Sequence, residues 1–395
     1  MISFKVIKIK PINCLIMCAS KNVSTGYGIV GKHLFEGLKK YPNIYLYHLG
    51  LQNIGHQLEK GQLAMGWKTN ASDVLSLYLK MYNIDVLITI TDNWMPDFHY
   101  IQDTAEKMGV KYLCHVTINT VPCPFILYNA IYKADHFVAP SDFVKEQLVN
   151  IRLTNVTTIY HGIDTTIFKP KSIEKKNKEF TFLAVGVNKT EQKNWLGLLK
   201  AFKYLVYDLN VKDVRLFIHT ETPNPPEGLD FDMAIEQAGL NGYVDVNYVI
   251  RNIGSTEERM SEIYNSCDAY VSASVGESFS CPLLESLACG LPAIVPDFSA
   301  MSELVKRSEA GYVAKLKTML TLPVIAEQGL VDEIDLAEQM KKVKELSPEQ
   351  REELSKHGVI FAKKYDWENV VKDWENLIKL VAEPKCDFVK DTTGL

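Results

Sequence analysis

The chain has 395 residues and a formal net charge of −5, and 47% of its residues are hydrophobic and 23% charged. These values are average for a globular protein, so they exclude collagen-like, mainly disordered and disulfide-scaffold chains, and a chain of this length is expected to form two domains. The acidic balance argues against nucleic acid as a partner.

The first half of the chain alternates short apolar runs with amphipathic stretches. Runs that are apolar on both faces predict strands of a parallel sheet covered by helices. We expect these strands at residues 12–18, 44–49, 84–90, 110–116, 136–139 and 156–160. Spacing of apolar residues by three and four predicts helices at residues 28–40, 72–81, 98–108 and 141–150, the last with Ser141 as its N-cap.

A glycine-rich run, GYGIVG, occupies residues 26–31 after the first expected strand. It matches G-x-G-x-x-G, but residues 19–25 separate it from the strand and no acidic residue closes the second strand, so it is not a dinucleotide-binding fingerprint. Two interpretations stay open. Either Gly26, Tyr27 and Gly28 form an acceptor-side or phosphate loop at a helix N-terminus, or the glycines allow close helix packing.

A polar, lysine-rich break at residues 170–179 predicts the domain boundary. The strand and helix pattern then restarts, with strands expected at residues 180–186, 214–219, 244–249, 269–272 and 293–295, and helices beginning near Lys193, Asp230, Thr256, Pro282 and Ser299. After residue 330 the pattern is helical, and Ser347-Pro348-Glu349 is an N-terminal cap signal. We place domains at residues 1–169 and 170–365, followed by a C-terminal helix at 366–382.

The most informative segment spans residues 275–292, VGESFSCPLLESLACGLP. Pro282 suits a first helical position and Gly290 a C-terminal cap, so the segment predicts a loop followed by a short helix over about residues 282–289. Glu285 is then expected in the first helical turn, where the helix dipole favours an ionised carboxylate that can accept both hydroxyls of a ribose.

Upstream of this helix, the N–H groups of Phe279, Ser280 and Cys281 are expected to be unpaired helix-start donors. Such donors suit an anionic or polyhydroxylated ligand. Glu277 lies on the loop that faces the same opening.

Three ordered segments resemble a large family of retaining glycosyltransferases with the GT-B fold, family 4, also called glycosyl transferases group 1. They are ESFSCPLLESLACGLPAI at 277–294, APSDFVK at 139–145 and IYHGIDTTIFKP at 159–170. Their order and spacing agree from about residue 12 to about residue 381. The resemblance implies an α/β fold of two Rossmann-like domains that face each other across a cleft, with a C-terminal helix that crosses back to the first domain.

The resemblance also implies an activity. A hexose would pass from a nucleotide diphosphate sugar, UDP- or GDP-linked, to a hydroxyl of a glycan, a lipid-linked acceptor or a small molecule, with retention and with no metal or other cofactor. Glu277 would contact the sugar near its reacting carbon, Lys193 would stabilise the leaving diphosphate and Glu285 would hold the ribose. Further donor contacts are expected from Gly186, Asn188, Lys189, Val249, Arg251, Ser278, Phe279, Ser280 and Cys281.

The sequence departs from the family pattern at two places. Val187 stands where the family has an arginine, and Lys189 is a candidate replacement cation. Ile118 stands where the family has a histidine, and His115 is a candidate catalytic substitute that we weigh against a packed, satisfied histidine. These departures motivate an alternative function, a catalytically degenerate GT-B homologue that acts as a non-catalytic partner subunit.

The N-terminus shows no export signal, and no run of eighteen apolar residues occurs anywhere. We therefore expect a cytoplasmic protein, and a peripheral contact of the N-terminal domain with the cytoplasmic membrane face stays open. The eight cysteines lie mostly in apolar segments, which predicts buried, reduced thiols.

Overall fold

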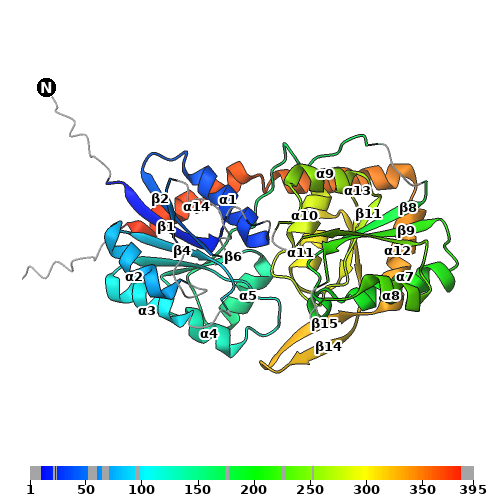
Figure 1. Cartoon of the computed structure of the whole chain (residues 1–395), viewed down its shortest axis with the longest axis horizontal. Coiled ribbons are helices and arrows are strands. Elements are labelled where there is room, and N and C mark those ends of the chain that lie inside the picture. The colour runs from blue at the N-terminus through cyan, green and yellow to red at the C-terminus, as the bar shows by residue number, and fades with distance from the viewer. Residues whose placement is uncertain are drawn as a thin grey trace, which may run out of the picture.

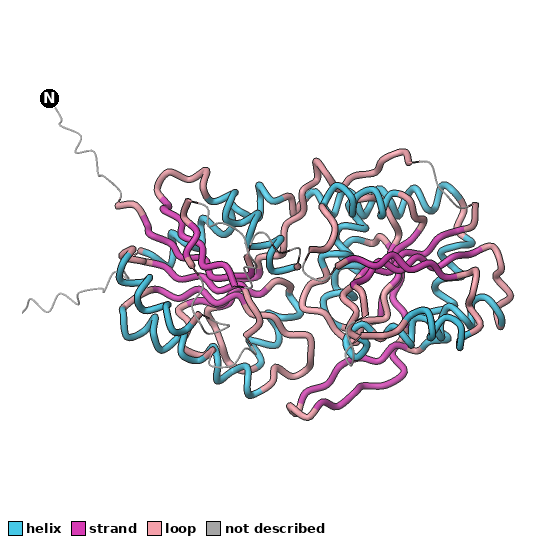
Figure 2. Tube along the Cα trace, viewed as in Figure 1, coloured by secondary structure: helices cyan, strands magenta, loops and turns pink. Residues whose placement is uncertain are grey.

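The computed structural model describes residues 10–20, 23, 25–51, 60–64, 71–93, 98–173, 178–223, 228–250 and 253–383. These residues form two α/β halves that lie side by side, each with a sheet between two layers of helices (Figures 1 and 2). The predicted fold class, two Rossmann-like domains built on parallel sheets, is confirmed.

The sheet of the first half has seven strands in the order β3-β2-β1-β4-β5-β6-β7, and its neighbours pair in parallel. All five residues of β4 are buried, because helices cover both faces of a parallel sheet. The strands are β1 (Ile12–Ala19), β2 (Ile44–Leu51), β3 (Gln62–Leu63), β4 (Val86–Ile90), β5 (Lys111–His115), β6 (His136–Ala139) and β7 (Val156–Thr158). The helices are α1 (Gly26–Leu38), α2 (Ser72–Met81), α3 (His99–Met108), α4 (Phe125–Ile131) and α5 (Asp142–Asn150).

The sheet of the second half has six strands in the order β10-β9-β8-β11-β12-β13, again all parallel. Its strands are β8 (Phe180–Val185), β9 (Val214–Glu221), β10 (Val244–Val249), β11 (Ala269–Val271), β12 (Ala293–Pro296) and β13 (Gly311–Ala314). Its helices are α6 (Thr190–Lys193), α7 (Trp195–Tyr207), α8 (Phe231–Ala238), α9 (Glu257–Asn265), α10 (Cys281–Ala288), α11 (Ser299–Ser308), α12 (Glu333–Glu345) and α13 (Pro348–Lys363).

The last helix, α14 (Trp367–Ala382), packs against the first half of the chain. Its buried residues recur at steps of three and four, and they share a core cluster with Leu34 of α1 and Val86 of β4. Trp374 is 2% exposed within this cluster. Figure 1 shows α13 and α14, in orange and red, running from the second half across to the first.

An antiparallel hairpin, β14 (Leu316–Leu322) and β15 (Ala326–Val331), projects from the second half (Figure 1). The sequence did not predict it, and it also did not predict β3, β13 or α4. The hairpin reaches the first half, since Val121 and Glu327 exchange two backbone hydrogen bonds of 2.9 and 2.8 Å.

Cysteine burial largely follows the expectation, because six of the seven cysteines in the described ranges are buried and Cys281 is half-buried. Among the helices that the structure describes, none has the length and apolar character needed to cross a membrane.

Candidate active site

Two loops of the second half meet where its strand order reverses, between β8 and β11. In open parallel sheets, ligands bind beyond the carboxyl ends of the strands at such a reversal. The segment after β8 carries Lys193 and the segment after β11 carries Glu277, and their ammonium and carboxylate groups form an ion pair. Gly186 permits this approach, because a Cβ there would lie only 3.2 Å from Cε of Lys193. The structure thus brings together the two residues expected to contact the diphosphate and the sugar.

The loop that carries Glu277 is held by the N-terminus of α11. The N–H of Glu277 donates to Oγ of Ser299 at 3.0 Å, and the N–H of Ala300 donates to the Glu277 carbonyl at 3.2 Å. Ser280 has φ +85°, a left-handed conformation that is strained for a residue with a side chain and that persists only when the surroundings hold it. The loop is therefore a fixed structure and not a random turn.

The amides at the start of α10 were expected to be unpaired donors. Within the described part of the chain, no acceptor is recorded for the N–H groups of Phe279, Ser280 or Cys281. Helix α10 begins at Cys281 with Pro282 in its first turn, and Gly290, with φ +84°, follows its end.

Glu285 does not lie where the sequence placed it. Because α10 begins at Cys281, Glu285 is its fifth residue, and the first turn holds no acidic residue. The expectation of an ionised carboxylate favoured by the helix dipole is therefore wrong, since that effect fades beyond the first turn. Burial raises the pKa of Glu285 to about 7, although Tyr264 of α9 donates its hydroxyl hydrogen to Oε2 at 2.7 Å, which acts in the opposite direction.

His115 lies at the end of β5 and is 1% exposed. Its Nε2 lies 3.0 Å from Nε2 of His161, whose Nδ1 lies 3.5 Å from Sγ of Cys281 at the start of α10. Burial, assisted by the neighbouring His161, holds the pKa of His115 well below its usual range, and burial lowers the pKa of His161 to about 4. Both imidazoles are therefore neutral at pH 7. His115 is packed, but its buried Nδ1 has no hydrogen-bond partner among the described residues, so it is not a fully satisfied histidine and its catalytic role stays a prediction.

Asn188 and Lys189 do not join the Lys193–Glu277 pair. The amide of Asn188 donates to the Leu229 carbonyl at 3.0 Å and accepts from the Leu229 N–H at 2.9 Å, so both of its polar atoms are engaged. Lys189 lines a separate cavity with Asp230 of the α8 cap and residues of α8.

The expected base pocket is only partly described. Val249 ends β10, and its carbonyl accepts the N–H of Thr222 at 3.0 Å. Arg251 lies outside the described residues. Among the described residues, no three His, Cys, Asp or Glu side chains form a cluster able to hold a metal ion.

The glycine-rich run forms the first turns of α1. Gly28 packs so closely that a Cβ there would lie 2.0 Å from the Val23 carbonyl oxygen, and its N–H donates to Oγ1 of Thr25 at 3.2 Å. The hydroxyl of Tyr27 lies 3.1 Å from Oγ1 of Thr117, and burial raises its pKa, with smaller contributions from Glu277 and Cys281 of the second half. A Cβ on Gly26 would meet nothing within 4 Å. These contacts favour the packing interpretation for Gly28.

Gly28→Ala should lower the free energy of unfolding by about 1–3 kcal/mol, because the new methyl group collides with backbone. Gly26→Ala is the matched control and should leave stability unchanged or raise it by about 0.4–1 kcal/mol, since its site is open. Urea unfolding of both variants measures the difference. Equal stability of the two would contradict the packing interpretation.

The sequence did not single out Tyr264 or Ser299 as site residues. Tyr264 lies in an amphipathic helix, where a tyrosine is ordinarily a core residue, and only the packing of α9 on α10 places its hydroxyl on Glu285. Ser299 opens a predicted helix, but its φ of +58° and its contact with Glu277 depend on tertiary structure.

Comparison with known sequences relates the second half to a transferase family. Residues 165–359 match the family model described as Glycosyl transferases group 1. The chain is 29% identical over 321 residues to the UDP-N-acetylglucosamine--peptide N-acetylglucosaminyltransferase GtfA subunit of Streptococcus gordonii, with 77% of this chain and 58% of that protein covered. It is 26% identical over 133 residues to O-antigen chain mannosyltransferase B of Escherichia coli, with 33% of this chain and 30% of that protein covered. The chain thus spans less than two thirds of either relative.

Comparison with solved structures identifies the fold as GT-B. A glycosyltransferase from Rickettsia africae superposes with a TM-score of 0.73 at 15% identity, covering 95% of this chain and 100% of that chain. Sucrose-phosphate synthase from Thermosynechococcus elongatus gives 0.73 at 13% identity, covering 94% and 99%. HepE of Anabaena, solved in complex with UDP, gives 0.65 at 13% identity, covering 93% and 100%.

Proposed function

We propose that the glycosyl transferases group 1 domain makes this protein a retaining glycosyltransferase, which moves a hexose from a UDP- or GDP-linked sugar to an acceptor hydroxyl. The observation that carries the proposal is the Lys193–Glu277 ion pair, together with the amides that begin α10, which have no acceptor among the residues that the structure describes. A cation, a carboxylate and free N–H donors at the strand reversal are the groups that a diphosphate and a sugar require.

Each group has a role in this proposal. Lys193 stabilises the leaving diphosphate without a metal, Glu277 positions and polarises the sugar, and Glu285 accepts the ribose hydroxyls. The amides of Phe279, Ser280 and Cys281 bind sugar hydroxyls or phosphate, and Val249 borders the base.

The transfer proceeds on one face of the sugar. The bond between the anomeric carbon and the phosphate oxygen breaks, the acceptor oxygen forms its bond on the same face, and the acceptor proton passes to the leaving phosphate. The proposal needs no covalent enzyme intermediate, so Glu277 does not act as a nucleophile.

In the proposed division of labour, residues 1–169 bind the acceptor, residues 170–365 bind the donor, and the helix within 366–382 ties the two domains together. The acceptor is a glycan, a lipid-linked sugar or a small molecule. We propose a cytoplasmic location, with contact to the cytoplasmic membrane face as the alternative that a lipid-linked acceptor would require.

A second candidate is a non-catalytic partner subunit. Val187 stands where the family has an arginine, so one cation that would bind the diphosphate is missing. His115, the candidate catalytic histidine, is buried and neutral. The Streptococcus gordonii relative is named as a subunit, and a GtfA/B complex is among the similar solved structures, with a TM-score of 0.59 at 18% identity.

Thermal-shift measurements with a panel of UDP- and GDP-sugars test the proposed function. A true donor at 100 times its dissociation constant adds about 2.7 kcal/mol of stability and should raise the melting temperature. Slow release of free sugar from that donor identifies the enzyme. Absence of any nucleotide effect, together with tight binding of a protein partner, would favour the subunit instead.

A further inference from the structure

Ser141 links the two halves of the molecule at the loop that carries Glu277. It is fully buried, and its hydroxyl accepts the N–H of Val144 at 3.3 Å as the N-cap of α5. The same hydroxyl donates its hydrogen to the carbonyl of Ser278 at 2.7 Å. Ser278 stands directly between Glu277 and Phe279, in the loop between β11 and α10. We call this loop the donor loop, after its role in the proposed function, and a first-half residue thus bonds its backbone.

Because the peptide bond is planar, the hydrogen bond from Ser141 to the Ser278 carbonyl also fixes the direction of the next N–H group. The carbonyl of Ser278 and the N–H of Phe279 belong to one peptide unit and point in opposite directions. Holding the carbonyl toward Ser141 therefore aims the Phe279 N–H away from α5. That N–H is one of the amides at the start of α10 that find no acceptor in the described segments of the chain.

A carboxylate from the second half fixes the position of Ser141. Glu303 of α11 accepts the N–H groups of Asp142 and Phe143 at 3.1 and 2.8 Å, so that Glu303 and Ser141 together satisfy the first three amides of α5. The side chain of Glu303 is only 14% exposed. It bridges the halves at the place where α5 begins.

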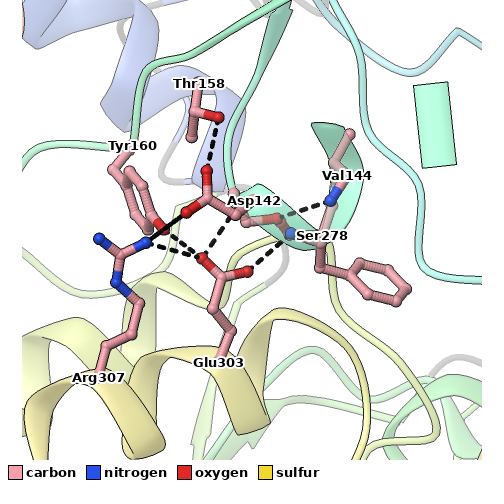
Figure 3. Close-up of polar contacts among 9 residues, drawn as sticks. Asp142, Val144, Thr158, Tyr160, Ser278, Glu303 and Arg307 are labelled. Carbon is pink, nitrogen blue, oxygen red and sulfur yellow. Dashed lines mark hydrogen bonds and ion pairs between the residues drawn. The ribbon is translucent and has the colours of Figure 1, made fainter. Parts of the chain in front are cut away.

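Two further side chains hold Glu303 in place, as Figure 3 shows. Tyr160 donates its hydroxyl hydrogen to Glu303, and Arg307 donates to the Tyr160 oxygen at 2.6 Å and pairs with Asp142. Glu303 and Arg307 belong to α11 of the second half, and both bond residues of the first half, Tyr160 and Asp142. The cluster is therefore specific to the arrangement in which the two halves are in contact.

Helix α11 connects this cluster to the donor loop. Ser299 at its start bonds the N–H of Glu277, and Glu303 one turn later bonds the start of α5. The loop is thus held from the second half by Ser299 and Ala300, and from the first half by Ser141.

We propose that Ser141 is a positioning residue: held by Glu303, it orients the Ser278–Phe279 peptide unit so that the Phe279 N–H faces the donor. This inference rests on the proposed function for its ligand, a nucleotide diphosphate sugar. The contact forms only when the halves meet, so the donor loop acquires its binding geometry through the acceptor-side domain.

The experiment compares full-length wild type with Ser141→Ala, which removes the bond to Ser278, and Ser141→Thr, which retains a hydroxyl. Ser347→Ala is the control, because it removes the N-cap of α13, remote from the site. Glu303→Gln weakens the contact that positions Ser141 and leaves the Ser141 hydroxyl itself in place. Two quantities are measured: hydrogen–deuterium exchange of the peptide 275–284 without ligand, and the dissociation constants of UDP and GDP by titration calorimetry.

Ser141→Ala should speed exchange in this peptide and weaken nucleotide binding, each by about fivefold, the usual effect of one lost hydrogen bond. Ser141→Thr should restore both quantities, Glu303→Gln should shift both in the direction of Ser141→Ala, and Ser347→Ala should change neither. Wild-type exchange in Ser141→Ala, or equal effects of Ser141→Ala and Ser347→Ala, would overturn the proposal. If exchange responds but wild type binds neither UDP nor GDP, the positioning role stands and the proposed donor class fails.

Discussion

Glu277→Gln should lower the rate of sugar transfer by about a hundredfold or more, while the protein stays folded. The reason is that the variant removes the charge that, in the proposed function, polarises the reacting sugar, and it leaves Lys193 without its carboxylate partner. Preorganised polar groups at a reacting centre contribute effects of this size, mainly in kcat. Steady-state kinetics with the identified donor, for transfer and for donor hydrolysis, measure the change.

Glu345→Gln is the matched control for this variant. Glu345 also pairs with a lysine, Lys341, but on the exposed surface of α12 far from the donor loop. Its kinetics should equal those of wild type, because surface ion pairs contribute little. Full activity of Glu277→Gln would remove Glu277 from the proposed mechanism.

Glu285→Gln should make the protein more stable than wild type at pH 8 and should weaken nucleotide binding. Burial raises the pKa of Glu285 from 4.5 to about 7, so the folded state binds a proton that the unfolded state has already released. Wild-type stability therefore decreases as the pH rises from about 4.5 to about 7, and the loss is complete above pH 7. The shift corresponds to at most about 3 kcal/mol.

Urea unfolding at pH 5 and pH 8 measures this effect. The advantage of Glu285→Gln over wild type should be small at pH 5 and large at pH 8, because glutamine does not titrate. Glu262→Gln is the control, since Glu262 is an exposed residue of α9 paired with Arg259. A pH-independent difference between Glu285→Gln and wild type would contradict a raised pKa.

A residue that lowers the stability of the free protein but strengthens ligand binding is expected to be a binding residue. A carboxylate that is expensive to ionise in the empty site is retained when a ligand needs it as an acceptor. Tyr264 reduces that cost by donating to Oε2, so the Tyr264–Glu285 contact influences the charge of the carboxylate that we propose as the ribose acceptor.

Most of the fold could be predicted from local pattern. Strands β6 and β10 and helix α2 have the predicted bounds, and most other predicted elements differ by one or two residues, because buried parallel strands and amphipathic helices carry strong periodic signals. The hairpin of β14 and β15 escaped prediction because its residues are mostly half-exposed and alternate weakly. Helix α4 is too short, at seven residues, for its periodicity to be distinctive.

The residues of the candidate site could be predicted from the sequence, but their positions and contacts could not. Residue pattern and family resemblance selected Lys193, Glu277 and Glu285, and the structure joins the first two. A one-residue difference in the start of α10 moved Glu285 out of the first turn, and burial beneath α9 then reversed the expected effect on its ionisation. Asn188 was selected by its neighbourhood in sequence, yet its side chain is engaged by Leu229, forty-one residues away.

The sequence by itself determined the two-domain α/β architecture and the chemical composition of the donor loop, because strand burial, helix caps and residue order are local properties of the chain. Only the tertiary structure decided which side chains meet and how they are charged. Ser141 contacts Ser278 across 137 positions, and Glu303 reaches α5 across more than 150. Contacts of that range, and the pKa values that depend on burial, are set by how the two halves pack together.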